Sequence, residues 1–309
     1  MERVTVVVPT RTYDVTVASG ILDEAGAELP ADDPQSWTWD GLSEFLIGYT
    51  RDAPEGRKGI AHNAYGDLNF EADETLAEAH TSLARVLQVY DWNWTDAEKE
   101  FKRAIELNPR YAVAHQWYGG YLERTGRVNE AISERKLALE LDPLSTITIF
   151  ELGQNFLFAR NYDQAIAQFQ RSLELDPDFP AAHQFLPVVY VQKGMYEEAL
   201  AKIREAPEGA AVNKTGVPGY VYAVSGHISE AKKELEELKS LRKTEYISAV
   251  YLAYICAGLG ERDEAMFWLE KGFEERAFQM QFLQVDPRLD NLRDDPRFKE
   301  LVRKVGFPS

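Results

Sequence analysis

Five histidines are the first candidates for chemistry, because imidazole is a common metal ligand and a general base near neutral pH. They are His62, His80, His115, His183 and His227. His80, His115 and His183 recur at intervals close to 34 residues or twice that, as the rungs of a metal ladder would. Zinc holds each nitrogen at about 2.1 Å, whereas the axes of neighbouring packed helices lie about 10 Å apart. The sequence therefore predicts histidines that pack within the fold, and no metal site.

The rest of the sequence contains no residue pattern typical of a catalytic site. No serine, histidine and acid form a pattern typical of a triad, and neither a Walker phosphate loop nor a paired CxxC occurs. The carboxylate pairs Glu236–Glu237 and Asp294–Asp295 lie in charged stretches, where solvated faces are the ordinary interpretation. Cys256, the single cysteine, lies in the apolar run AVYLAYICAG, which favours a buried thiol over a reactive one. We therefore predict no enzyme, no catalytic residue and no cofactor.

A repeated corner positions these residues. ELNPRYAVAH, ELDPLSTITI and ELDPDFPAAH follow one another so that Pro109, Pro143 and Pro177 are 34 residues apart. A proline cannot continue a helix, and small side chains let two antiparallel helices approach closely, so the pattern predicts helix–turn–helix units. The small residues that recur at fixed places are Ala84, Gly119, Gly153, Ala97, Ala131, Ala165, Ala104, Ala138 and Ser172. The glycines expected in the turn between two helices are Gly126, Gly194, Gly226 and Gly260.

This pattern resembles the tetratricopeptide repeat, a 34-residue helix–turn–helix unit that stacks into a right-handed superhelix. The likeness covers residues 77–276 and implies about six units. Their expected starts are Ala77, Ala112, Thr146, Pro180, Val212 and Tyr246. The predicted fold is all-α: a tetratricopeptide superhelix with a short N-terminal β-hairpin segment and a C-terminal capping segment over residues 277–309. The amphipathic stretch LDNLRDDPRFKELVRKVGF is the expected capping helix.

A second resemblance concerns the setting of the repeats. DETLAEAHTSLARV and VDPRLDNLRDDPRFKELVRKVGF are similar to repeat arrays attached to bacterial regulators, kinases and cyclases. This likeness implies an interaction or sensing module. It leaves open that the chain is the sensing or regulatory module of a larger bacterial signalling protein, with a kinase, cyclase or DNA-binding domain encoded nearby.

Residues 1–30 do not follow the repeat. RVTVVVP and YDVTVAS alternate with a two-residue period and predict a β-hairpin, and GILDEAGAEL predicts a short helix. This opening resembles that of 3-dehydroquinate synthase, which implies nicotinamide-dinucleotide binding. No Gly-rich nucleotide loop and no cluster of Glu and His metal ligands follows, so that enzyme ranks last among the functions we consider. Residues 31–76 predict an irregular, partly helical N-terminal cap.

The charge balance restricts the class of partner. The net charge is −17, with 51 acidic and 34 basic residues, which argues against nucleic acid and against an anionic membrane surface. The start MERVTVVVPT lacks the pattern of a signal peptide, and no stretch approaches the roughly 18 apolar residues that span a bilayer. We expect a cytoplasmic protein with a protein or peptide partner, and the oligomeric state stays open.

Three departures from the repeat pattern predict local changes. The corner DWNW, Asp91–Trp94, has one extra residue, and its tryptophans either fill a widened turn or form a binding hot spot. Pro187 falls inside a first helix, which should kink or begin late. Residues 205–220, EAPEGAAVNKTGVPGY, predict an early helix end and a hinge.

The concave side of such a stack is the expected binding surface. Positions two, five, nine and twelve of each first helix face it, and here they are mostly apolar with a few amides. We therefore predict a groove for an apolar extended segment or an amphipathic helix. The alternative is that the groove is narrow or is filled by the chain's own ends, which would make the apolar strip part of the core. The predicted groove residues are Ile147, Phe150, Gln154, Leu157, Gln184, Val188, Val191, Asn213, Tyr220, Val250 and Tyr254, with Phe150, Tyr220 and Tyr254 as anchors.

A different kind of groove is not expected. Chaperone-binding members of the repeat family hold a terminal carboxylate with Lys, Asn and Arg side chains on the inner helices. The comparable places in this chain hold Thr81, Arg85, Trp117 and Glu151. The set includes an acid, so a carboxylate clamp of that kind is disfavoured.

Overall fold

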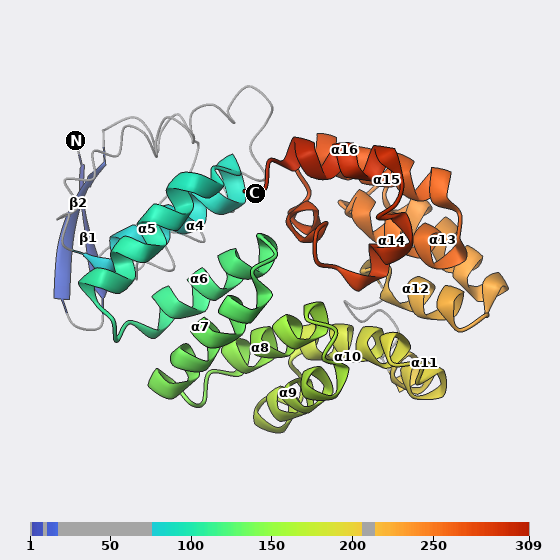
Figure 1. Cartoon of the computed structure of the whole chain (residues 1–309), viewed down its shortest axis with the longest axis horizontal. Helices are drawn as coiled ribbons and strands as arrows, with labels where there is room; N and C mark the ends of the chain where they lie inside the picture. Colours follow the sequence, from blue (N-terminus) through green and yellow to red (C-terminus); the bar gives the residue numbers. More distant parts are fainter. Residues whose placement is uncertain (1, 9–10, 18–75, 206–213, 309) are drawn as a thin grey trace. The chain divides into compact units, whose positions relative to one another are not determined.

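Helices follow one another in pairs from residue 77 onward (Figure 1). The computed structural model describes residues 2–8, 11–17, 76–205 and 214–308. The chain divides into two units, residues 1–76 and residues 77–309, and each is described separately.

In the first unit, β1 (Glu2–Val8) and β2 (Arg11–Val17) form an antiparallel pair. Glu2 lies opposite Val17, and Val8 lies opposite Arg11. The short helix expected before residue 30 and the cap expected over residues 31–76 lie outside the described residues.

Six helix pairs can be followed in the described part of the second unit. They are α4 (Ala77–Val86), continued by the π-helical turn η1 (Leu87–Asp91), with α5 (Trp94–Leu107); α6 (Ala112–Arg124) with α7 (Val128–Leu141); α8 (Thr146–Phe158) with α9 (Tyr162–Leu175); α10 (Pro180–Gln192) with α11 (Tyr196–Glu205); α12 (Val217–Val224) with α13 (Ile228–Leu241); and α14 (Ala249–Leu259) with α15 (Arg262–Glu274). The 3-10 helices η3 (Phe278–Phe282) and η4 (Pro287–Leu292) and the helix α16 (Pro296–Val305) follow. The first four pairs begin at the residues expected from the sequence, and the last two first helices begin three to five residues later than expected.

Small residues set the distance between the two helices of a pair. Gly153 is the clearest case, because a Cβ atom there would lie 2.6 Å from Cε1 of Phe169 on the partner helix. Ala97, Ala131 and Ala165 on the second helices are fully buried at the same kind of crossing. Successive first helices also contact one another, from α4 to α6 and onward to α14, and so form an inner row.

Histidines fasten the corners between pairs. Nε2 of His115 lies 3.0 Å from the carbonyl oxygen of Pro109, and Nε2 of His183 lies 2.7 Å from that of Pro177. Each ring therefore ties a first helix to the corner that precedes it. The Glu134 carboxylate, 2.7 Å from Nδ1 of His115, raises the pKa of that imidazole.

The extra residue of the first pair is absorbed by a change of helix type. α4 passes into the π-helical turn η1, which takes one more residue per hydrogen-bonded turn than an α-helix. Trp92 then ends the turn with a positive φ of 54°.

Pro187 does not delay or interrupt its helix. α10 begins at Pro180 and runs through Pro187 to Gln192, so the predicted late start was wrong. A proline removes one backbone donor, but the buried neighbours Leu186, Val188 and Val189 hold this turn against the rest of the core. The predicted hinge over residues 205–220 falls largely on residues 206–213, which are outside the described residues.

The turns inside the pairs use left-handed backbone. Gly126, Gly194, Gly226 and Gly260 have φ between 76° and 85°, and in the third pair Arg160 takes the same place with φ of 61°. Glycine adopts this conformation without the clash that a Cβ atom causes.

We expect alanine at Gly216 to destabilise the protein more than alanine at Gly194. Both glycines have positive φ, so each substitution should cost about 1 kcal/mol of backbone strain. A Cβ atom at Gly216 would also lie 2.5 Å from the carbonyl oxygen of Tyr251, whereas Gly194 has nothing within 4 Å. The clash should add roughly 2 kcal/mol. Urea denaturation of both variants measures the difference, and equal losses would contradict the close approach of α12 to α14.

Candidate functional site: the inner face and its covering segment

The predicted groove is not open in this structure. Seven of its side chains are buried: Phe150, Leu157, Val188, Val191, Tyr220, Val250 and Tyr254. Gln154 and Gln184 are half-buried, Ile147 is 49% exposed, and Asn213 lies outside the described residues. The expectation of an exposed apolar strip was therefore wrong for the buried seven. Their contact with a partner remains a prediction.

Phe150 packs between helices and does not face a groove. Its ring centroid lies 5.3 Å from that of Phe169, 5.4 Å from that of Phe179 and 5.5 Å from that of Phe185. These rings belong to α9, the following corner and α10. A side chain at the fifth position of this first helix thus points into the contact with the next pair, which rules out Phe150 as an accessible anchor.

Residues 278–293, named here the covering segment, lie against the inner row of helices. We call the surface they contact, on α6 to α14, the inner face. The ring of Phe282 lies 5.7 Å from that of Phe158 at the end of α8. Near the other end of the segment, Nδ2 of Asn291 donates to the carbonyl oxygen of Ala257 on α14 at 2.8 Å. The expected C-terminal cap therefore does more than cover the last helix pair, because its first part runs across the inner face.

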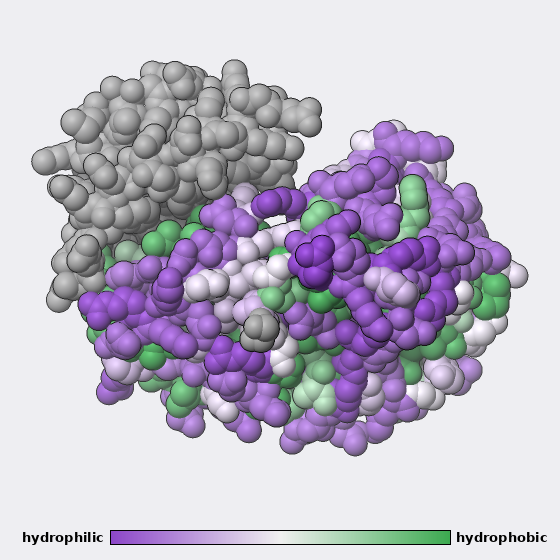
Figure 2. Space-filling view, turned by 45° about the horizontal axis from the view of Figure 1, so that its top comes forward, coloured by the Kyte–Doolittle hydropathy of each residue, from purple (hydrophilic) through white to green (hydrophobic). Residues whose placement is uncertain are grey.

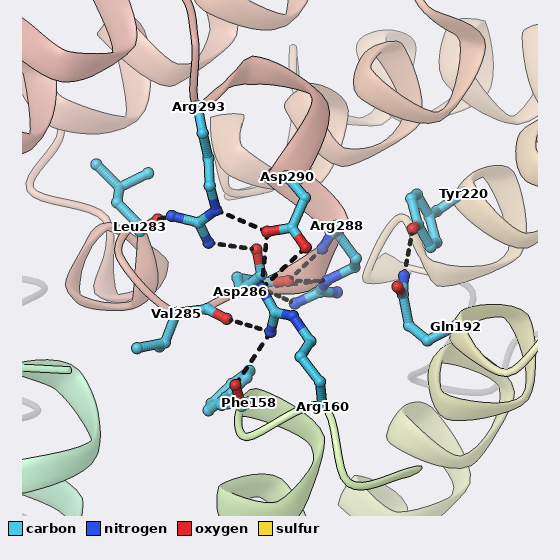
Figure 3. A network of polar contacts seen from close by, with 10 residues as sticks. All are labelled: Phe158, Arg160, Gln192, Tyr220, Leu283, Val285, Asp286, Arg288, Asp290 and Arg293. Carbon is cyan, nitrogen blue, oxygen red and sulfur yellow. Dashed lines mark hydrogen bonds and ion pairs between the residues drawn. The ribbon is translucent and has the colours of Figure 1, made fainter. Parts of the chain in front are cut away.

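An ion pair forms the middle of this contact (Figure 3). Nη2 of Arg288 lies 2.7 Å from Oδ2 of Asp286, and both residues are buried. The guanidinium carbon of Arg288 lies 3.6 Å from the centroid of the Tyr254 ring, a cation–π contact. Burial alone would raise the pKa of Asp286, but the attraction of Arg288 and the hydrogen bonds to it hold that pKa below its usual value.

The inner face also contributes polar groups around this ion pair. Burial raises the pKa of the Tyr220 hydroxyl, which accepts a hydrogen bond from Nε2 of Gln192 at 2.7 Å. The Tyr254 hydroxyl is hydrogen-bonded to Asp286, and the ring of Phe185 lies 5.7 Å from the Arg288 guanidinium. Aromatic rings, two of them with hydroxyl groups, thus surround the buried ion pair.

Arg160 holds the covering segment from the third turn. Its Nη1 donates to the carbonyl oxygen of Val285 at 2.8 Å, and its Nη2 lies 2.7 and 2.9 Å from the two carboxylate oxygens of Asp290. Arg293 braces the segment internally, donating to the carbonyl oxygens of Leu283 and Asp286. Figure 3 shows both arginines converging on the same short stretch of chain.

The last elements return to the first pair. Nε1 of Trp94 donates to the carbonyl oxygen of Val305 at 3.2 Å, and its ring lies 5.1 Å from that of Phe307. Trp92 lies 5.8 Å from the Phe273 ring and 5.1 Å from the Arg276 guanidinium. The two tryptophans of DWNW therefore bind the C-terminal elements of the same chain.

A buried charge network lies beside the covering segment on α6, α7 and α8. The Glu123 carboxylate accepts from Nδ2 of Asn155, and Arg135 donates to Glu151 and to the carbonyl oxygen of Gln116. Burial, partly offset by the nearby arginines, raises the pKa of Glu123 to about 7. Glu151, at one of the places where a carboxylate clamp needs a free cation, is itself bound by Arg135.

Arg124 connects this network to the covering segment. Its guanidinium carbon lies 4.7 Å from the centroid of the Phe282 ring and 5.4 Å from that of Phe278. Gly120 makes room for it, because a Cβ atom there would lie 2.7 Å from Nη1 of Arg124 and 3.1 Å from Nη2 of Arg135. Burial lowers the pKa of Arg124 to about 9.

One group of possible metal ligands occurs among the described residues. Ligand atoms of Cys256, Glu261 and Glu264 lie within 4.8 Å of one another. Burial raises the pKa of the Cys256 thiol to about 12, and the two carboxylates are paired with Lys232 and Lys239. A protonated thiol and two neutralised carboxylates are poor ligands, so we assign no metal here.

The surface on one side of the molecule is mostly hydrophilic. On the side shown in Figure 2, hydrophilic residues predominate among the coloured atoms, and hydrophobic ones form separate small patches. Among the described residues, no helix has the length and apolarity needed to cross a membrane.

Sequence reasoning missed Arg160, Phe282, Asp286 and Arg288. One signal was available, because DPR occurs twice in VDPRLDNLRDDPRF. In both copies the aspartate caps a helix by accepting from the backbone N–H of the arginine, and the arginine side chain returns to the same carboxylate. The motif thus predicts a self-paired helix start, but the motif alone does not show that one copy is buried.

Residues 87–145 and 150–213 match a family model described as tetratricopeptide repeat. These ranges run from η1 to beyond α11, so the repeats predicted around Pro109, Pro143 and Pro177 are confirmed, and the match does not reach the helices of the last two predicted units. The match does not include residues 1–30 and gives no support to the likeness with 3-dehydroquinate synthase, or to that with bacterial regulators, kinases and cyclases. The comparison with curated proteins gave no match.

Several solved structures are similar to this chain, and one of them has a similar overall fold. A tetratricopeptide repeat protein from Parabacteroides merdae is 16% identical, with a TM-score of 0.55 over 85% of this chain and 98% of its own. The pilF protein of Pseudomonas aeruginosa is 22% identical, with a TM-score of 0.48 over 67% of this chain and 92% of its own. YrrB, described as a TPR protein with an unusual peptide-binding site, is 21% identical, with a TM-score of 0.38 over 60% and 96%. At these identities the first likeness supports the fold, and none transfers a partner.

The two DPR motifs provide a matched test of the buried ion pair. Arg288→Ala should lower the free energy of unfolding by roughly 3–5 kcal/mol, because it leaves the Asp286 carboxylate buried without its partner. Arg297→Ala removes the equivalent arginine where the side chain is 45% exposed, compared with 6% for Arg288. We expect a much smaller loss there. Chemical denaturation at pH 7 measures both, and similar losses would contradict a buried pair that the inner face needs.

Glu123→Gln should change how stability depends on pH. The pKa of Glu123 rises from 4.5 to about 7 on folding, so its ionisation destabilises the wild type progressively between these pH values. The shift corresponds to about 3 kcal/mol. The stability of Glu123→Gln relative to wild type should therefore increase by an amount of that order from pH 5 to pH 8.

The control for this prediction is Glu130→Gln, because Glu130 is exposed and Arg127 lowers its pKa. Its difference from wild type should stay flat over the same range, where this carboxyl is ionised in both states. Urea denaturation at several pH values gives both curves. A constant difference for Glu123→Gln would show that the carboxyl is not perturbed.

Proposed function

We propose that this chain is a non-catalytic protein–protein interaction scaffold whose inner face binds a non-helical segment of a partner. The observation that carries the proposal is that the inner face already holds such a segment of its own. Residues 278–293 contact it through 3-10 turns, rings and backbone carbonyl groups. A stack of tetratricopeptide repeats presents a continuous surface of this kind, which suits an extended ligand.

The contacts are of a type that recognises peptides. Asn291 donates to a backbone carbonyl of α14, and Arg160 donates to a backbone carbonyl of the segment. Such bonds depend on the course of the backbone, while Tyr254 and Phe158 provide surfaces for an arginine and for an aromatic ring. Together they supply the backbone recognition and side-chain selection expected of a peptide site.

The predicted groove residues take different roles in this proposal. Gln154, Gln184 and Ile147 keep exposed surface and are available to a partner in the structure as it stands. Tyr220 and Tyr254 become available when the covering segment leaves. Replacing these buried residues by alanine would test stability rather than binding, because a cavity in the core costs several kcal/mol.

Site-specific crosslinking tests the proposal without removing a core side chain. A photoreactive benzoylphenylalanine is placed in cells at Gln192, which lies beside Tyr220 on the inner face, and separately at Glu140, an exposed residue of α7. We expect a crosslinked protein from position 192 and none from position 140. Mass spectrometry of the adduct should then map the crosslink to one short segment of that protein.

Purified partner and chain must afterwards bind each other in solution, so that capture alone does not count as support. Crosslinks from position 140 only, or from position 192 to the chain's own C-terminal residues only, would contradict partner binding on the inner face.

A further inference from the structure

Three residues other than glycine have left-handed backbone in the described part of the chain, and all three lie at contacts between the C-terminal region and the helix pairs. Among the described residues, Trp92, Arg160 and Arg276 have positive φ, with values of 54°, 61° and 50°. A Cβ atom makes this conformation unfavourable, so such residues persist where surrounding contacts hold them. All three contact elements far from them in the sequence, and these contacts join the C-terminal region to the helix pairs.

Arg160 is the most informative of the three. Four other pairs place glycine at this turn, and only in the third does an arginine stand there among the described turns of this kind. Its side chain reaches Val285 and Asp290 of the covering segment. The strained turn therefore directs a guanidinium onto the segment that occupies the inner face.

Trp92 and Arg276 form the second contact of this kind. The Arg276 guanidinium lies 5.1 Å from the Trp92 ring centroid, and its Nη1 donates to the carbonyl oxygen of Tyr90 at 2.6 Å. Arg276 lies two residues before the covering segment starts. The segment is thus held just before its start by the first pair and near its end by the third.

We propose that the covering segment is an internal competitor, latched by Arg160 and Arg276, that a partner segment of similar chemistry displaces from the inner face. The partner segment carries an aromatic residue, an acid four residues later and an arginine two residues after that, as do Phe282, Asp286 and Arg288. This inference rests on the proposed function and names the partner's chemistry and the regulation of the same site.

The contact of Arg160 with Asp290, which we call the latch, suits exchange of the covering segment for another segment better than permanent binding. The side chains of Arg160 and Asp290 are 34% and 44% exposed, so solvent and salt weaken their attraction. The Asp286–Arg288 pair, in contrast, is buried on aromatic rings and sets what the inner face selects. A weak exposed latch beside a selective buried contact allows a competing segment with the same acid and arginine to replace the covering one.

Arg160→Gly removes the contacts of Arg160 with the covering segment without disturbing the turn of the third pair. It removes the contacts to Val285 and Asp290 and gives the third turn the glycine that the other turns have, so the turn itself is relieved of strain. Asp290→Asn weakens the same ion pair from the other side. Arg103→Ala, which removes an exposed arginine paired with Glu106 on α5, is the charge-matched control.

The measurement is the fluorescence anisotropy of a labelled synthetic peptide spanning residues 277–295, added to each full-length protein. The fraction of chains with an uncovered inner face sets the apparent affinity. We expect Asp290→Asn, which keeps Arg160 for the peptide's own Asp290, to bind the peptide about tenfold more tightly than wild type, and Arg103→Ala to match wild type. Arg160→Gly should gain little, because it removes the same contact from the peptide and from the covering segment. A peptide carrying Arg288→Ala should bind none of them measurably.

Equal affinity of the peptide for wild type and Asp290→Asn, with both folded by circular dichroism, would overturn the inference. Concentration-dependent dimers of Arg160→Gly in sedimentation would overturn it differently, since a second copy's segment would then be the occupant. If wild type and Asp290→Asn capture the same partner equally at position 192, the proposed scaffold function stands and the proposed competition by the covering segment fails. If the peptide binds as expected and position 192 captures no protein, the competitor stands and the proposed function fails.

Discussion

The ion pair of Asp286 and Arg288 is the interaction on which the arrangement of the inner face depends. A guanidinium enters an apolar surface only when its charge is met nearby. Here the acid stands two residues earlier, with Pro287 between them, so both partners of the pair belong to the covering segment itself. Once Arg288 lies on Tyr254, the rest of the segment has one register, which places Phe282 on α8 and Asn291 on α14.

Much of the array could be predicted from the sequence because its units repeat. Pro109, Pro143 and Pro177 give the period, and small residues such as Gly153 lie where two helices must nearly touch. The helix ends and helix crossings recur from unit to unit because they depend on local features, namely proline geometry and side-chain size. Such reasoning correctly predicted the starts of the first four pairs. It was wrong about a late start of the helix that contains Pro187, where packing of neighbouring residues outweighs one lost hydrogen bond.

The candidate site was harder to predict from the sequence, because its contacts join the repeated helix pairs to a C-terminal segment that is not a repeat. Helical spacing predicted that Tyr220 and Tyr254 face inward, and filling of the groove by the chain's own ends was the stated alternative. Spacing did not identify residues 278–293 as the segment that lies there. Phe150 has the same spacing and points into the next pair instead, since the side chain's direction depends on how far the helices are rotated against each other. Arg160 stands where other pairs have glycine, an irregularity whose meaning appears only when Asp290 is placed beside it.

The return of the last elements to the first pair has a consequence for how the protein folds. In an open array each pair contacts only its neighbours, so stability adds along the chain and the ends fray independently. Here Trp94 bonds Val305, 211 residues further along, and Arg276 bonds Tyr90, 186 residues earlier. Contacts of such sequence separation close a long loop and slow folding. They also couple the terminal pairs, so residues 77–308 should unfold as a more cooperative unit than an open stack of the same helices.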